Sequence, residues 1–196
     1  MSDTKKIPFA LGAADSYLRM AEVPYAQLSE RWRSRTSGGQ QAPVSNPGEL
    51  SPLVSNVGFG IELLLKVLRI QDSSAAPRGH KLLDLFSPLH DDVRRSLESR
   101  YTSHLTIAEK SDGAPYVLFN LKQITPAVDV TPAATVQGAL KNMNRAFEEW
   151  RYMYELENLP SGVLYFNFFE SIAVAKALRA EISEFKCGAV VRFERA

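Results

Sequence analysis

The feature that most constrains the fold is a stretch over residues 52–71 that is apolar on nearly every side of a helix. Its apolar members are Val54, Val57, Phe59, Ile61, Leu63, Leu64, Leu65, Val67, Leu68 and Ile70. A surface helix needs one apolar stripe, whereas a helix that is apolar all round has to be enclosed by its neighbours. We therefore expect this segment to form the central helix of a bundle.

Helical spacing of apolar residues also recurs outside this block. Residues 11–32 carry an apolar stripe at intervals of three and four, interrupted by Pro24, which predicts a kink there or a second helix beginning there. Further helices are expected at about 80–89, from Asp91 to about 105, from Thr131 to about 155, and at about 162–185. Thr131 can cap its helix, with Pro132 at the first helical position.

These patterns together predict an all-α fold, a single-domain bundle of five to seven helices over residues 1–196. Short extended segments are expected near 115–121 and 188–194. Residues 33–52 are rich in glycine and proline and almost free of apolar residues, which predicts a flexible loop.

Composition and charge narrow the class of protein. Hydrophobic residues make up 45% and charged residues 23% of the chain, and 23 basic against 22 acidic residues give a net charge of +1. Proteins that coat nucleic acid carry a large overall positive charge, so this balance excludes that class of protein. It still allows a local basic patch on the surface. The single Cys187 excludes an internal disulfide, and the N-terminal MSDTKK has no apolar signal core. We expect a cytoplasmic protein with no membrane span.

Several common catalytic and cofactor motifs are absent from the sequence. It has no glycine-rich phosphate loop, no dinucleotide fingerprint, no Gly-x-Ser-x-Gly elbow and no histidine pair at metal-ligand spacing. The sequence accordingly predicts neither a cofactor nor a metal.

The informative polar residues lie within apolar helices. Glu62, Lys66 and Arg69 form a thin polar stripe on the most apolar block. One interpretation is a solvated edge with an i,i+4 ion pair, and the other is a partly buried polar cleft between helices. Arg151, Tyr152 and Glu155 are expected either on a solvated face or on a surface that stacks bases and binds phosphate.

His80, one of three histidines, is expected at the start of a short helix, with Arg78 in the turn before it and Asp84 at i+4. It is either a structural hydrogen-bonding group or a group that exchanges protons near neutral pH.

The order of three segments, IELLLKVL, RGHKLLDLFSPL and AFEEWRYMYE, resembles the prokaryotic branch of the HEPN superfamily over about residues 54–185. This resemblance implies a small helical domain, usually dimeric, of the kind found in toxin-antitoxin and phage-defence systems. Ribonuclease members of the superfamily carry an Arg followed, after four to six residues, by a His. Here Arg100 and His104 have three residues between them, so the sequence departs from that pattern.

The leading hypothesis is a homodimeric module that binds RNA or a nucleotide through a polar cleft, with Arg78 as a further ligand-binding residue. The cleft is formed by Glu62, Lys66, His80, Arg151, Tyr152 and Glu155. One alternative is a metal-independent endoribonuclease with His80 or His104 as the general acid/base and Arg151 or Arg100 binding phosphate. The other is a non-catalytic subunit that binds a cognate protein.

Overall fold

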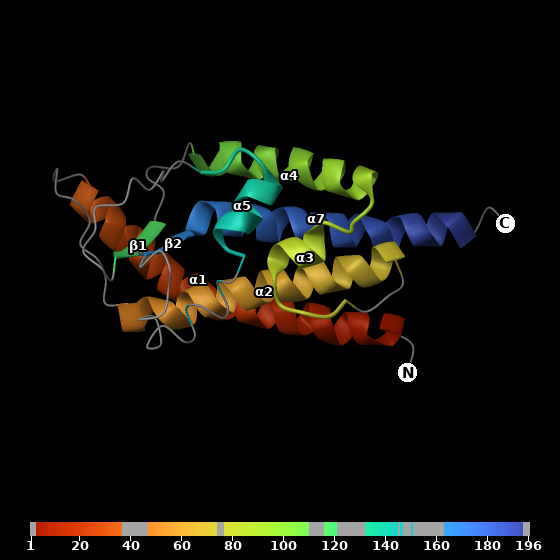
Figure 1. The fold of residues 1–196 in the computed structure, drawn as a ribbon, viewed down its shortest axis with the longest axis horizontal. Helices are drawn as coiled ribbons and strands as arrows, with labels where there is room; N and C mark the ends of the chain where they lie inside the picture. The colour runs from red at the N-terminus through yellow and green to blue at the C-terminus, as the bar shows by residue number, and fades with distance from the viewer. Residues whose placement is uncertain are drawn as a thin grey trace.

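The computed structural model describes residues 3–36, 47–73, 77–109, 116–120, 132–144, 146, 150 and 163–193. Its elements are, in chain order, η1 (Asp3–Lys6), α1 (Ile7–Thr36), α2 (Pro47–Ser73), α3 (Leu82–Phe86), α4 (Asp91–Glu109), β1 (Tyr116–Asn120), α5 (Val136–Asn142), β2 (Val163–Asn167) and α7 (Phe168–Phe193). The long helices lie lengthwise beside one another, and the two strands lie towards one end (Figure 1). The predicted all-α bundle is confirmed.

Helix α2 occupies the centre of the bundle, as its apolar composition predicts. It packs against α1, α3 and α7. Leu65 and Val67 stand two residues apart and so point to nearly opposite sides of this helix, and both are 0% exposed. Because neighbours cover α2 on several sides, apolar residues are stable at nearly every position along it.

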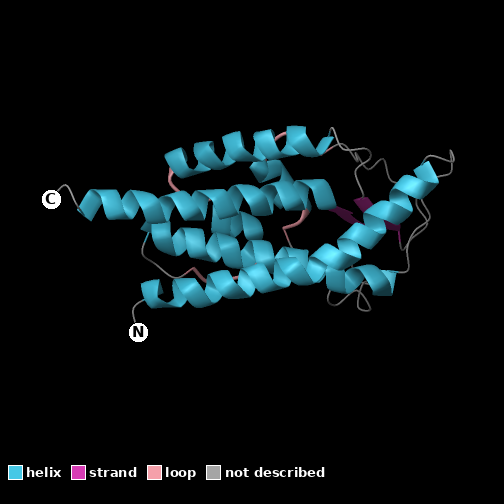
Figure 2. Cartoon of the chain, turned by 180° about the vertical axis from the view of Figure 1, so that it is seen from behind, coloured by secondary structure: helices cyan, strands magenta, loops and turns pink. Residues whose placement is uncertain are grey.

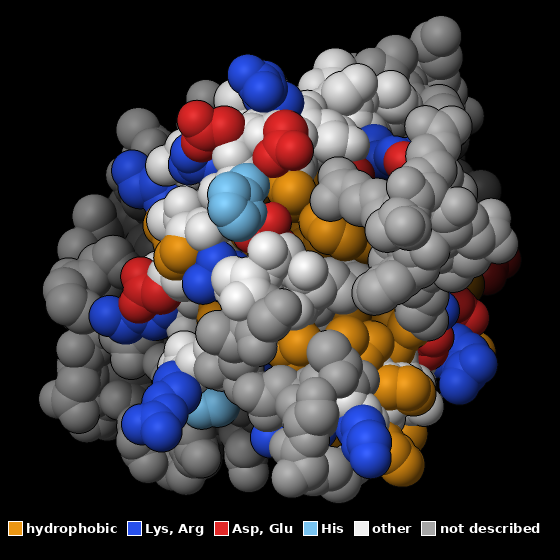
Figure 3. Space-filling view, turned by 90° about the vertical axis from the view of Figure 1, so that its right-hand side faces the viewer, with side chains coloured by type: hydrophobic (Ala, Val, Ile, Leu, Met, Phe, Trp, Pro, Cys, Tyr) orange, Lys and Arg blue, Asp and Glu red, His pale blue; other side chains and the backbone are white. Residues whose placement is uncertain are grey.

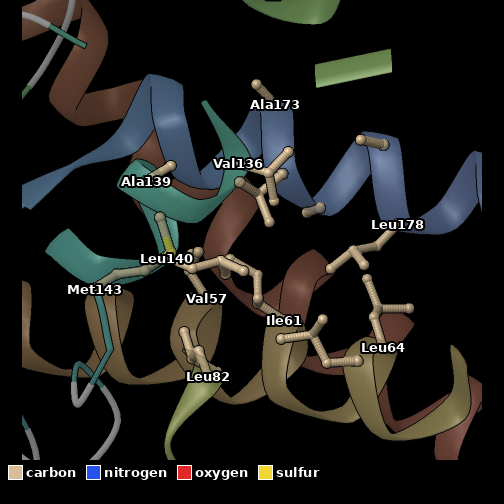
Figure 4. Close-up of a cluster of buried hydrophobic side chains, with 14 of the residues drawn as sticks. Val57, Ile61, Leu64, Leu82, Val136, Ala139, Leu140, Met143, Ala173 and Leu178 are labelled. Atoms are coloured by element: carbon tan, nitrogen blue, oxygen red, sulfur yellow. The ribbon is translucent and has the colours of Figure 1, made fainter. Parts of the chain in front are cut away.

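Short helices complete the core above α2. Figure 4 shows Val136 and Leu140 of α5 in a cluster with Ile61 and Val57 of α2 and Leu178 of α7, with Met143, just after α5, beside Leu140. The α3 residue Leu82 lies at the edge of the same cluster. This cluster fixes the position of the segment before α3, where the predicted site residue His80 lies.

The starts of two helices follow from capping chemistry. Helix α4 begins at Asp91 as predicted, with Asp91 and Asp92 in its first turn, where carboxylates interact favourably with the helix dipole. Helix α5 begins at Val136, later than expected. Its cap is Thr135, whose hydroxyl accepts a hydrogen bond from the Gly138 amide at 3.0 Å. The expected cap, Thr131, lies outside the described residues.

Two expectations about the C-terminal third are wrong. The predicted helix from about 162 begins only at Phe168, because Val163–Asn167 pairs antiparallel with Tyr116–Asn120, with Tyr116 opposite Asn167. The extended segment near 115–121 is thereby confirmed as β1. Asn167 ends the strand and caps α7, its Oδ1 accepting from the amides of Phe169 and Glu170. The second predicted extended segment, 188–194, is helical through Phe193.

Helix α1 contains Pro24 and is continuous from Ile7 to Thr36. Figure 2 shows that its second half turns away from the axis of its first half, so the predicted kink is confirmed rather than two separate helices. The predicted loop 33–52 is too long, because α1 extends to Thr36 and α2 begins at Pro47, where proline suits the first helical turn. Residues 37–46 lie outside the described residues.

Candidate functional site

A buried carboxylate joins three of the predicted site residues. Glu62 on α2 is 0% exposed, and its Oε1 lies 2.7 Å from Lys66 Nζ and 3.0 Å from His80 Nδ1. The side chain of Lys66 is 22% exposed and that of His80 is 53% exposed. The cleft interpretation of Glu62 and Lys66 therefore describes this geometry better than a solvated edge does. Among the described residues, Glu62 Oε2 has no hydrogen-bond partner.

The segment before α3 differs from the prediction. The helix begins at Leu82 rather than at His80, and the partner of His80 is Glu62 rather than Asp84. Gly79 has φ +90°, a left-handed conformation that glycine adopts readily, and it turns the chain just before His80. The hydrogen bond to Glu62 then holds His80 against α2.

The first amides of α3 are satisfied from another element. Leu82 N donates to the Asn144 carbonyl at 3.3 Å, and Leu83 N donates to Asn144 Oδ1 at 2.8 Å. This leaves Arg78, His80 and Lys81 as an exposed basic run on a segment held by Glu62 at His80 and by Asn144 at the start of α3. The remaining predicted cleft residues, Arg151, Tyr152 and Glu155, lie outside the described residues.

Arg100 and His104 share α4 but have different surroundings. Arg100 Nε donates to Glu181 Oε2 at 2.9 Å, and its guanidinium also pairs with Glu184. The hydrogen bond with Glu184 is the main cause that raises the pKa of Arg100. Ser96 donates to the same Glu181 oxygen at 2.6 Å, so Arg100 belongs to a network that joins α4 to α7.

His104 lines an apolar groove between α1 and α7, together with Lys176 and Arg179. Burial lowers its pKa, and the positive charges of Lys176 and Arg100 lower it further. His104 is therefore held in its neutral form over a wider pH range than a free histidine. Arg100 is directed to the α7 carboxylates while His104 faces the groove, which does not favour a joint catalytic role.

Glu170 is a buried polar residue that the sequence reasoning missed. It is 0% exposed and accepts from the Ala133 amide at 2.6 Å and from Asn142 Nδ2 at 3.2 Å. Burial is the main cause that raises its pKa. These bonds tie α5 and the segment before it to the first turn of α7, a structural role. A charged residue inside a very apolar run is the only sign of this role in the sequence. The partners of Glu170 could not be predicted, because they lie far away along the chain.

The pairing of His90 with Asp72 predicts a pH dependence of stability. His90 Nδ1 donates a hydrogen bond to Asp72 Oδ1 at 2.6 Å. This bond, and then the Asp72 charge, raise the pKa of His90 above its usual value. A group whose pKa is higher in the folded state stabilises the fold when it is protonated. This contribution is fully present below the unfolded pKa of about 6.5, and it is lost as the pH rises through the folded pKa. We expect His90→Gln to lower the thermal midpoint more at about pH 5.5 than at about pH 8.5.

His104→Gln is the matched control with the opposite sign. Because the pKa of His104 is lowered, wild-type stability falls as pH drops from about 6.5 through the folded value, and the substitution removes this acid sensitivity. Thermal melts of both variants across this range, read by circular dichroism, check the pair. A His90→Gln effect that grows with rising pH would contradict the assignment.

One end of the bundle carries charges of both signs. At the end of the bundle seen in Figure 3, Lys and Arg side chains are interspersed with Asp and Glu, and hydrophobic side chains gather in the lower half. Within the described ranges, no three or more His, Cys, Asp or Glu side chains are grouped to hold a metal ion. None of the described helices combines the length and apolar character needed to cross a bilayer.

No protein-family model, curated protein or solved structure matches this chain. The HEPN resemblance therefore stays a prediction, and function has to be argued from the geometry of the site.

Proposed function

We propose that this chain is a non-catalytic helical module that binds the phosphate groups of RNA or of nucleotides through the segment 78–81. The observation that carries the proposal is the exposed run of Arg78, His80 and Lys81, anchored to the buried carboxylate of Glu62. In keeping with the HEPN resemblance, we place it in a homodimer that serves a prokaryotic defence, toxin-antitoxin or stress system.

The chemistry of this segment suits a phosphate group. Arginine offers a planar fork of donors that matches phosphate oxygens, and lysine offers a compact positive charge. Lys66 neutralises Glu62 at 2.7 Å, so the buried carboxylate repels an approaching anion less than an unpaired one would. Because His80 is held by Glu62, the loop is ordered before binding, which reduces the entropy lost when a ligand binds.

The surroundings of the predicted catalytic pair support the non-catalytic version. A ribonuclease of the kind that the resemblance implies needs an arginine that is free to contact phosphate beside a histidine that transfers protons. The Arg100 guanidinium binds Glu181 and Glu184, and His104 faces an apolar groove. The basic run 78–81 is better placed to meet a phosphate from solvent.

Binding of a single-stranded RNA oligonucleotide, ATP and inorganic phosphate tests this proposal. We expect the double variant Arg78→Ala/Lys81→Ala to bind RNA about tenfold more weakly. The slope of its log affinity against log salt concentration should fall by the equivalent of about two phosphate contacts. Comparing the three probes shows whether a polymer, a nucleotide or phosphate alone is recognised. Fluorescence anisotropy at several salt concentrations supplies the measurement.

The matched control is Lys5→Ala/Arg19→Ala, which removes one lysine and one arginine that are exposed on the N-terminal helices. It should bind like wild type. Equal loss in both double variants would mean that only overall charge matters and would refute a site at 78–81. Metal-free cleavage of the RNA by wild type, abolished by His80→Ala or His104→Ala, would replace the module with the endoribonuclease alternative.

A further inference from the structure

Helices α1 and α7 run in opposite directions, as their positions in Figure 2 show, and they are joined at two points. Arg179 on α7 donates to Asp15 Oδ2 on α1 at 2.6 Å. Farther along, the rings of Tyr25 and Phe168 are 5.8 Å apart between centroids. At 1.5 Å per residue, the stretch of α1 between these two contacts is roughly 15 Å long. The two helices are therefore clamped at both ends of an elongated space.

The space between the clamps is a groove with a volume of about 500 Å³. Small side chains leave it open, because Ala21 stands on the α1 wall and Ser171, Ala175 and Ala180 stand on the α7 wall. Val57 of α2 also contributes to its lining. Its volume lies within the range of small-molecule sites, which are concave, mostly apolar and equipped with a few polar groups.

The polar groups of the groove are unevenly distributed. Lys176 on α7 is exposed, and among the described residues it forms no ion pair. His104 enters from α4 on the same side, and its pKa is lowered first by burial and then by the nearby positive charges of Lys176 and Arg100. Arg179 is already paired with Asp15, and Glu22 lies on the opposite helix, α1. One side of the groove is therefore positive, while the walls between the clamps are mostly apolar.

We propose that this groove binds an elongated apolar molecule ending in a carboxylate, of the fatty-acid class, with its chain between α1 and α7 and its carboxylate beside Lys176 and His104. The chain would cover the apolar walls, and the carboxylate would pair with Lys176 and accept a hydrogen bond from the imidazole of His104. The binding site is separate from segment 78–81, so the proposal does not depend on phosphate binding there.

Isothermal titration of the full chain with dodecanoate, below the concentration at which it forms micelles, tests the proposal. We expect saturable binding of one dodecanoate per chain. Dodecanol, which has the same chain without the charge, should bind about fivefold more weakly, and acetate, which has the charge without the chain, should not bind measurably. Absence of saturable dodecanoate binding, or equal binding of dodecanoate and acetate, would overturn the proposal.

Variants distinguish the two parts of the site. Lys176→Gln should weaken dodecanoate about fivefold while leaving dodecanol unchanged, whereas Lys141→Gln, an exposed lysine on α5, should change neither. Ala175→Phe should fill the groove and abolish binding of both. If Ala175→Phe does not fold, Ile172→Trp, which alters a half-buried lining residue, serves the same purpose. Unchanged dodecanoate binding in a folded groove-filling variant would place the ligand elsewhere.

Discussion

Lys66→Met is expected to lower the free energy of unfolding by about 3 kcal/mol. Glu62 is fully buried, and its Oε1 is shared between Lys66 at 2.7 Å and His80 at 3.0 Å. Removing the ammonium group leaves a buried carboxylate whose remaining described partner, His80, is 53% exposed. An incompletely compensated buried charge is among the most destabilising changes in a protein. Urea unfolding followed by circular dichroism at neutral pH measures the loss.

The opposite substitution, Glu62→Met, is expected to cost less, about 1 kcal/mol. It removes the buried charge itself, and both Lys66 and His80 are exposed enough to be hydrated instead. The double variant Glu62→Met/Lys66→Met should then be more stable than Lys66→Met alone, with a coupling energy of about 2 kcal/mol. If the losses of the two single variants simply add, Glu62 and Lys66 are not an interacting pair.

Leu64→Ala is expected to destabilise the protein by about 3 kcal/mol, the second large effect. Leu64 is 0% exposed, and in Figure 4 it points from α2 towards α7, which carries Leu178. Truncation removes buried methyl groups and leaves a cavity that the surrounding helices can fill only in part. Urea unfolding again supplies the measurement, with an unchanged slope showing that the denatured state is unaffected.

Leu63→Ala is the matched control, because it makes the same truncation one residue away on the same helix. Leu63 is only half-buried, so its loss should be about 1 kcal/mol. Equal effects at the two positions would contradict the placement of α2 at the centre of the bundle.

Much of the candidate cluster could be predicted from local sequence. Glu62 and Lys66 are one helical turn apart, so their proximity follows from helix geometry alone. The burial of Glu62 could not be predicted in the same way, because a solvated edge and a partly buried cleft both fitted the sequence. The contact with His80 could only be suggested, because it depends on how Gly79 turns the chain and how Asn144 anchors α3 against α5.

Other parts of the site had no local signal. Arg100 and His104 were grouped because they share a helix, but Arg100 binds Glu181 and Glu184, residues far along the chain. The groove beside His104 exists because α1 and α7 are clamped at two points with small residues between them. The ion pairs of Arg100 and the groove both depend on residues from separate segments, so no residue spacing within one segment predicts either of them.

The sequence by itself determined that this protein is a helical bundle and that residues 52–71 lie at its centre, because periodicity and apolar content act within single segments. It also determined that Glu62 and Lys66 meet. Only the tertiary structure decided that Val163–Asn167 is a strand, since pairing with Tyr116–Asn120 outweighs helical preference there. It likewise decided the partners of His80 and Arg100 and the groove between α1 and α7, because these depend on contacts between residues distant in sequence.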